Sequence, residues 1–158
     1  MSAEVVWDAG DMKKGQHHYH GPHSRYRLQY HLVWIPKYRR RVMVGDVAAS
    51  VRKLFYDCAQ MNDWWITRLA VMPDHVHLLI ELPPTVSISQ TVKTFKGGSS
   101  RALRQMHPEL DEWLWGDSFW AVGYFAESVG RVTENAIKLY IENQTDHPSM
   151  PKQRSLGL

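Results

Sequence analysis

The stretch Met72-Pro73-Asp74-His75-Val76-His77-Leu78-Leu79-Ile80-Glu81-Leu82 places two histidines one residue apart at the start of an apolar run. In a β-strand, side chains two residues apart point to the same face of the sheet. His75 and His77 are therefore expected to project together, while Val76 and Leu78 point to the opposite face. Two neighbouring imidazoles on a rigid strand form half of a site for a divalent metal ion. The alternative is a pair of surface histidines, and a third ligand and a nucleophile are needed to decide.

The composition is that of one globular domain. The chain has 158 residues, 44% of them hydrophobic, and no run of about 18 apolar residues that would predict a transmembrane helix. The N-terminus has no basic segment followed by an apolar one, so no secretory signal is expected. The single cysteine, Cys58, excludes an internal disulfide and a multi-cysteine zinc site. We therefore expect a cytoplasmic protein with no membrane partner.

Basic residues gather in local clusters although the net charge is only +3 at pH 7. One cluster follows the first predicted strand, and the other lies along a predicted helix. The two clusters are Lys37, Arg39, Arg40 and Arg41, and Lys93, Lys96, Arg101 and Arg104. Local basic patches without overall basicity suit a protein that contacts phosphates over a limited surface. An ordinary solvated face is the alternative.

The chain divides into a domain and two tails. Residues 1–22 contain several glycines and little periodicity, which predicts a flexible N-terminal extension. Residues 23–145 carry the alternating strand and helix patterns of the folded domain. Residues 146–158 form a proline-containing, basic C-terminal tail.

Within the domain, four segments have strand patterns and three have helical spacing. The strands are predicted at 25–34, 64–71, 75–82 and 119–125, and the helices at 46–61, from 87 to beyond 103, and at 133–143. Asp46 and Thr133 are predicted to cap the first and the last of these helices, and Ser87 opens the second. Gly97 and Gly98 interrupt the second helix at about 1 kcal/mol each relative to alanine. They mark either a kink or a place where another backbone or a phosphate comes close.

This order of elements is that of the ferredoxin-like split βαβ unit, followed by one extra helix. We therefore expect an α+β fold: a ferredoxin-like or RRM-like antiparallel four-stranded sheet with two backing helices and a further C-terminal helix. The third strand is central in that topology. His75 and His77 are thus expected to face away from the backing helices, onto a surface where a ligand can sit.

The last predicted helix carries a candidate nucleophile. Tyr140 and Gln144 are four residues apart and share one helix face. Tyrosine forms covalent intermediates in some enzymes, but its ordinary pKa near 10 means that it needs help to attack a phosphodiester at neutral pH. A metal ion gives such help by stabilising charge on the phosphate oxygens. The alternative is a tyrosine ring packed on the core; Tyr124, in a strand pattern, is read as structural in that way.

Several motifs, in this order along the chain, resemble the single-tyrosine HUH transposases, small TnpA-type enzymes that move insertion sequences as single-stranded DNA. The motifs are His31-Leu32-Val33-Trp34-Ile35-Pro36-Lys37-Tyr38-Arg39, His75-Val76-His77, Lys96-Gly97-Gly98-Ser99-Ser100-Arg101, Phe119-Trp120-Ala121-Val122-Gly123-Tyr124-Phe125 to Val129-Gly130, and Tyr140-Ile141-Glu142-Asn143-Gln144. The resemblance covers about residues 24 to 145.

The resemblance implies an endonuclease and strand transferase whose C-terminal helix is catalytic. His75, His77 and Gln144 would bind magnesium or manganese, and manganese suits imidazole better. Tyr140 would attack the scissile phosphate, leaving a 5′-phosphotyrosine link and a free 3′-hydroxyl. The partner would be single-stranded DNA with hairpins at the element ends. Family members are homodimers in which the tyrosine helix can complete the partner subunit's histidine site.

Further roles follow from this reading. The residues expected to neutralise DNA phosphates are Lys37, Arg39, Arg40, Arg41, Lys96 and Arg101. Asp74 is a candidate to orient His75, although turn formation explains it equally well. Glu81 shares the face of His77. The tryptophans Trp64, Trp65, Trp113, Trp115 and Trp120 are expected to fill the core or a dimer interface.

Two other functions remain open on the sequence. A relaxase or rolling-circle replication initiator shares the HUH chemistry, but usually in longer chains. A non-catalytic RNA-binding module has the same topology and would stack bases on aromatic residues of its central strands. Here the third strand carries His75, His77 and Leu79 instead. A histidine-triad hydrolase would need a third histidine at position 79.

Overall fold

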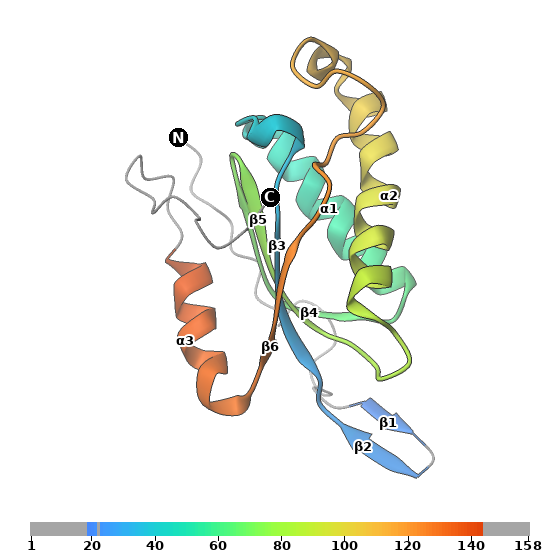
Figure 1. The fold of residues 1–158 in the computed structure, drawn as a ribbon, viewed down its shortest axis with the longest axis vertical. Coiled ribbons are helices and arrows are strands. Elements are labelled where there is room, and N and C mark those ends of the chain that lie inside the picture. The colour runs from blue at the N-terminus through green and yellow to red at the C-terminus, as the bar shows by residue number, and fades with distance from the viewer. Residues whose placement is uncertain (1–18, 22, 144–158) are drawn as a thin grey trace.

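A computed structural model of the chain describes residues 19–21 and 23–143. The main sheet has four antiparallel strands in the order β4-β5-β3-β6, formed by Trp65–Met72, His75–Glu81, Gln29–Trp34 and Phe125–Val129. Helices α1 (Gly45–Met61) and α2 (Ile88–Met106) cover one face, and α3 (Arg131–Glu142) lies against the other (Figure 1). The predicted α+β fold is confirmed, with the histidine strand β5 in the centre of the sheet.

The core lies between the sheet and the two long helices. Val76, Leu78 and Ile80 of β5 point into it, because alternate residues of a strand share a face. At its centre, the Trp34 ring lies 5.5 Å from the ring of Phe55 on α1 and 6.0 Å from that of Phe95 on α2. Truncating such a buried aromatic residue to alanine costs about 3–5 kcal/mol. This packing fixes β5, and therefore its histidines, relative to the rest of the sheet.

The helix ends agree with the sequence at one of three predicted starts. Ser87 caps α2, since its Oγ accepts the backbone N–H of Gln90 at 3.1 Å. In α1, Asp46 lies in the first turn rather than at the cap, where its charge still favours the positive helix end. In α3, Thr133 lies inside a helix that begins after Gly130, so the predicted cap is wrong.

Helix α2 runs without a break through Gly97 and Gly98. The predicted interruption is therefore wrong, because the turns on either side bury Phe95, Ser99 and Leu103 against the rest of the domain. Apart from the adjoining residues and the nearby backbone of α2 itself, no heavy atom of the described residues lies within 4 Å of a Cβ built at either glycine, so neither glycine serves a close approach of another described segment.

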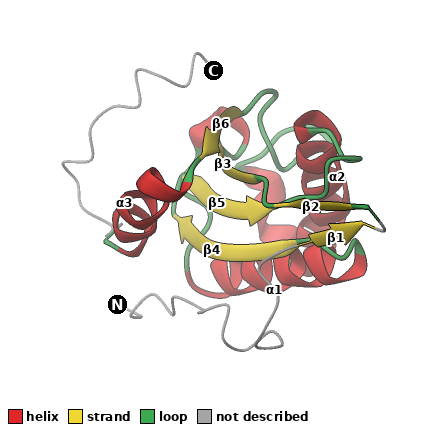
Figure 2. Cartoon of the chain, turned by 90° about the horizontal axis from the view of Figure 1, so that it is seen from below, coloured by secondary structure: helices red, strands yellow, loops and turns green. Residues whose placement is uncertain are grey.

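Two predicted strands differ in their bounds. The segment 25–34 is divided: Ser24–Tyr26 (β2) pairs with Tyr19–Gly21 (β1) in a hairpin that extends from one end of the main sheet (Figures 1 and 2). β1 therefore falls within the predicted extension 1–22, and the other tail residues lie outside the described part. The fourth strand begins at 125 instead of 119. Phe119 and Trp120 are buried as a loop on the core, and Gly123, with a φ of 95°, separates them from β6.

No helix in the described part of the chain combines the length and the apolar character needed to span a bilayer.

Candidate active site

His75 and His77 project together from β5 on the face that carries α3, as their spacing predicts. Their rings lie 4.8 Å apart and nearly perpendicular, and their exposed fractions are 1% and 2%. The surface-histidine alternative is excluded by this burial. A buried polar ring is costly unless its nitrogen atoms have partners, so the contacts of these rings indicate what the site is built to hold.

The ring of His75 is oriented by Asp74. Its Nδ1 lies 2.6 Å from Asp74 Oδ1, and Asp74 Oδ2 accepts a hydrogen bond from Arg39 Nε at 3.1 Å. Burial by itself would raise the pKa of Asp74, but its hydrogen bonds and charge interactions with His75 and Arg39 outweigh burial and lower the pKa to about 2. Asp74 is thus a carboxylate at neutral pH, and it accepts the Nδ1 proton of His75.

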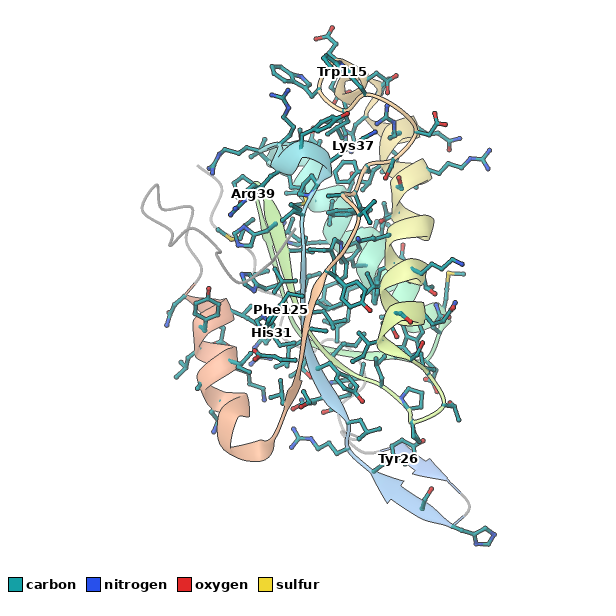
Figure 3. All side chains as sticks on the ribbon, viewed as in Figure 1. Tyr26, His31, Lys37, Arg39, Trp115 and Phe125 are labelled. Atoms are coloured by element: carbon teal, nitrogen blue, oxygen red, sulfur yellow. The ribbon has the colours of Figure 1, made fainter. Side chains whose placement is uncertain are left out.

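The ring of His77 is held by His31, the first residue of a motif quoted above, for which no role was predicted. His77 Nδ1 lies 3.0 Å from Nε2 of His31 on β3, and His31 Nδ1 lies 3.0 Å from Glu127 Oε1 on β6. Figure 3 shows His31 beside Phe125, in the middle of the molecule near α3. Burial holds the pKa of His77 well below its usual range, and the neighbouring His75 and His31 act in the same direction. His77 is therefore neutral at pH 7.

The remaining ring nitrogens fit a metal ion. Nε2 of His75 and Nε2 of His77 are both buried and have no hydrogen-bond partner among the described residues. Two neighbouring imidazoles whose buried Nε2 atoms have no partner among the described residues are the donor set that Mn²⁺ and similar divalent ions accept. Within the described part of the chain, no group of three or more His, Cys, Asp or Glu side chains is arranged to hold a metal. A further protein ligand would have to be of another type, and Gln144, predicted for that role, lies outside the described residues.

Tyr140 on α3 stands next to this pair. Its ring centroid lies 5.5 Å from that of His77, with the two planes nearly perpendicular, and 45% of the residue is exposed. The ring thus packs on His77 with part of its surface open to solvent, an arrangement that fits both a nucleophile and a ring packed with its hydroxyl at the rim. The structure therefore brings three of the four predicted catalytic and metal-binding residues together.

Helix α3 is fastened to the sheet on both sides of Tyr140. Ile141 packs with Ala70, Leu79 and Val129 in a second, smaller core, with Ile137 against it. Glu142 accepts a hydrogen bond from Arg68 Nε of β4 at 2.6 Å. Ile137 and Ile141 are four residues apart, so they share the helix face that packs on the sheet. With that face docked, the ring of Tyr140 contacts His77 of β5.

Glu81 shares the histidine face but has other partners. Its Oε1 accepts from Arg27 Nε at 3.3 Å and from Gln29 Nε2 at 3.2 Å. These contacts hold the Glu81 carboxylate at the end of the sheet where β3 begins. A ligand or base role for Glu81 is not supported by them.

The three arginines of the first basic cluster line a groove of about 760 Å³ at one end of the molecule. The groove is lined by Tyr38, Arg39, Arg40, Arg41, Val42, Val44, Asp46, Val47, Glu109, Leu110 and Trp113. Tyr38 and Arg39 have positive φ values of 59° and 52°, a left-handed conformation that costs non-glycine residues about 1–2 kcal/mol each. This turn places Arg39 both beside the groove and on Asp74. The groove is thereby connected to the histidine site.

Lys37 faces a different partner from the three arginines. Its Nζ donates a hydrogen bond to the backbone oxygen of Trp115 and lies 5.5 Å from the centre of the Tyr38 ring (Figure 3). A Cβ added at Gly116 would come within 2.7 Å of this Nζ, so that glycine permits the contact. Trp113 and Trp115 are 53% and 69% exposed. These two rings therefore do not fill the core, and a place in a dimer interface stays a prediction for them, whereas Trp64 and Trp120 are buried as expected.

The second predicted DNA-binding pair is divided by the fold. Arg101 is exposed on α2, but the Nζ of Lys96 donates to the backbone oxygens of Ala121 and Gly123 at 2.8 and 2.6 Å. These bonds hold the loop that precedes β6. DNA binding by Lys96 stays a prediction, but its contacts within the chain are those of a loop anchor.

The burial of Lys96 predicts a pH-dependent contribution to stability. Burial lowers its pKa from the ordinary 10.5 to about 8. Between these values the unfolded chain binds a proton that the folded protein releases, so the free energy of unfolding rises with pH. We expect the wild type to gain stability relative to Lys96→Met as the pH rises from 8 to 10, measured by urea unfolding at both pH values. Lys93→Met, at an exposed position of the same helix, should show no such change. An equal difference at both pH values would contradict the assignment.

Comparison with known proteins gives a consistent result. A sequence model of the family described as IS200-like transposases matches residues 24–144. The chain is 40% identical over 136 residues to the ISDra2 transposase TnpA of Deinococcus radiodurans, covering 86% of this chain and 93% of that protein. It is 31% identical over 134 residues to the transposase for insertion sequence element IS200 of Salmonella typhimurium, covering 85% and 88%.

Two solved structures share the fold. One is a crystal structure of a Deinococcus radiodurans protein assigned as a transposase, with a TM-score of 0.64 and 38% identity over 84% of this chain and 98% of that chain. The other is a REP-associated tyrosine transposase bound to a REP hairpin, with a TM-score of 0.53 over 78% of this chain and 69% of that chain. Its identity is 12%, so it shows a common fold alone.

Proposed function

The chain belongs to the IS200-like transposases, and on that premise we propose that it cleaves and rejoins single-stranded DNA at the ends of an insertion sequence through a 5′-phosphotyrosine on Tyr140. The observation that carries this proposal is the placement of Tyr140 beside two buried imidazoles with unpaired Nε2 atoms. Transposition is the activity of the family. The tyrosine chemistry and the metal dependence are our proposals for how this chain performs it.

In the first step, the phenolic oxygen of Tyr140 attacks the scissile phosphorus. A bond forms between this oxygen and phosphorus, the bond from phosphorus to the 3′ oxygen breaks, and that oxygen leaves as a hydroxyl after taking up a proton. His75 and His77, with Gln144, would hold a magnesium or manganese ion. Such an ion polarises the phosphate oxygens and stabilises their developing charge. Burial lowers the pKa of His77, which keeps the lone pair of that ring available at neutral pH.

In the second step, the 3′-hydroxyl of another DNA end attacks the phosphotyrosine. Its oxygen replaces the phenolic oxygen on phosphorus, and Tyr140 is restored. Each ester replaces another, so strand exchange needs no nucleotide hydrolysis. The exposure of Tyr140 supports this step, because the phosphotyrosine must be reached by a second DNA strand.

The groove beside Arg39, Arg40 and Arg41 is the surface that we propose for DNA. Its arginines suit backbone phosphates, and the exposed Tyr38 and Trp113 suit stacking with unpaired bases. Arg39 connects this surface to His75 through Asp74. The REP-associated relative is bound to a hairpin, and we propose hairpin-containing single-stranded DNA as the partner of this chain as well.

We further propose that the active form is a homodimer, the commonest symmetric assembly. In this structure Tyr140 lies beside His77 of its own chain. We propose that the same helix can instead serve the equivalent site of a partner subunit.

The test is a cleavage assay that reports which DNA end becomes attached to the protein. Hairpin-containing single strands, labelled at either the 5′ or the 3′ end, are incubated with the protein and Mn²⁺ and separated on a denaturing gel. We expect the 3′-labelled strand to move with the protein and the 5′-labelled fragment to be released. Attachment of the 5′-labelled fragment, or release of both, would contradict the proposed polarity.

The same assay separates the other functions. A second strand added after cleavage should be joined to the attached end; cleavage without joining would favour an endonuclease of the relaxase type. Binding without cleavage on any hairpin would favour a nucleic-acid-binding module. The structure speaks against such a module because α3 and the histidines lie on the sheet face that bases would use.

A further inference from the structure

We propose that His31 and Glu127 are positioning residues, which hold His77 in the one tautomer that leaves its Nε2 unprotonated and directed to the metal site. The inference rests on the proposed metal-binding function of His77. It adds strands β3 and β6 to a site that the motifs place on β5 and α3 alone.

The strand order brings these three side chains together. His31 on β3 pairs directly with Glu127 on β6, and Val33, two residues along β3, pairs with His77 on β5. Residues two apart on a strand share a face, so His31 stands diagonally beside His77 and directly beside Glu127. The two hydrogen-bond distances of 3.0 Å follow from this register.

The chemistry of the partners determines where the protons lie. A carboxylate only accepts hydrogen bonds, so Nδ1 of His31 carries the proton that Glu127 accepts. The contact between His31 Nε2 and His77 Nδ1 needs one donor and one acceptor, and we assign the donor to His77, because a proton on its Nε2 would be buried without an acceptor among the described residues. The lone pair of His77 is left on Nε2, the buried atom without a partner. Asp74 imposes the same arrangement on His75.

Ring packing holds His31 in position between Glu127 and His77. The rings of His31 and His77 are stacked with centroids 5.2 Å apart and planes within 10°. Phe125 contacts His31 edge-on from β6 at 6.1 Å. Metal-binding histidines commonly donate their other ring N–H to such a partner, and loss of the partner weakens metal affinity about 10–100-fold. A ring kept only for packing would be replaceable by phenylalanine without that effect.

The test compares variants that separate the ring from its hydrogen bonds. His31→Phe keeps an aromatic ring but removes both nitrogens, whereas His31→Gln can place an amide oxygen near the position of Nε2. We expect Mn²⁺ affinity, measured by the loss of the free-ion electron paramagnetic resonance signal, to fall about 10–100-fold in His31→Phe. His31→Gln should recover most of this loss.

Glu127 supplies a second variant that is not expected to disturb folding, because its side chain is 47% exposed. Glu127→Leu removes the acceptor and should weaken Mn²⁺ binding several-fold, whereas Glu127→Gln retains an acceptor oxygen and should not. The tautomer of His77 is read independently from the ¹⁵N shifts of the metal-free protein. We expect the Nδ1-protonated form in the wild type and a mixture of tautomers in His31→Phe and Glu127→Leu.

A matched control is available in His107, which is buried and bonded to Ser50 Oγ at 2.8 Å in a different part of the chain. His107→Phe should lower stability without changing Mn²⁺ affinity. Unchanged affinity and an unchanged His77 tautomer in His31→Phe would overturn the positioning role while leaving the proposed function intact. Absence of Mn²⁺ binding by the wild type would overturn the metal site itself, and the inference with it.

Discussion

Replacing Tyr140 with phenylalanine is expected to abolish the covalent protein–DNA product while leaving DNA and Mn²⁺ binding within about twofold of the wild type. The substitution removes one oxygen atom and keeps the ring that lies beside His77. Loss of an enzymatic nucleophile commonly lowers the rate by more than about a thousandfold. The denaturing gel should therefore show no attached DNA in Tyr140→Phe under conditions in which the wild type is fully modified.

Tyr124→Phe is the matched control for this result. Tyr124 is also partly exposed, but it precedes β6 in a loop anchored by Lys96 and is not on α3. The product should form normally in that variant. A band of unchanged intensity in Tyr140→Phe would show that another residue is the nucleophile, and its loss in Tyr124→Phe alone would identify that residue.

The second large effect is expected from the histidine pair. His75→Ala or His77→Ala should lower Mn²⁺ affinity by more than about a hundredfold, because loss of a ligand exceeds the 10–100-fold cost of losing a ligand's partner. Cleavage should fall below detection in both variants. In the wild type, a chelator should stop cleavage and added Mn²⁺ should restore it.

The substitution of His77 is also expected to lower the stability of the fold. His77→Ala removes the partner of His31 Nε2 and opens a space beside the stacked ring, so we expect a loss of about 1–3 kcal/mol in the free energy of unfolding. His107→Ala, at a buried histidine outside the site, should cost a similar amount without affecting cleavage. Retention of full Mn²⁺ affinity in both His75→Ala and His77→Ala would mean that the two unpartnered Nε2 atoms are not the binding site.

The parts of the fold that were predicted correctly depend on short-range patterns. The strand period of two places His75 and His77 on one face, and the Ser87 hydroxyl caps α2 within three residues. The predictions were wrong where packing against residues distant in the chain, and not the local sequence pattern, decides the conformation. The apolar run from Phe119 looks like a strand, but its rings pack on the core as a loop that pairs with Pro36 through an isolated bridge. Likewise, α2 continues through Gly97 and Gly98 because the packing of its buried face outweighs the low helix propensity of the two glycines.

The sequence by itself determined the histidine pair, the tyrosine helix and the family resemblance, because each motif consists of residues that are near one another in the chain. Only the tertiary structure decided which partners hold the site. His31 is 46 residues from His77, and Glu127 is 96 residues from His31. No spacing rule connects them, since their contact depends on β3 lying between β5 and β6. The same strand order, together with the docking of α3 through Ile141, brings Tyr140 to His77. Strand order is set by packing of the whole domain, and for that reason the second half of the site became visible only in the folded chain.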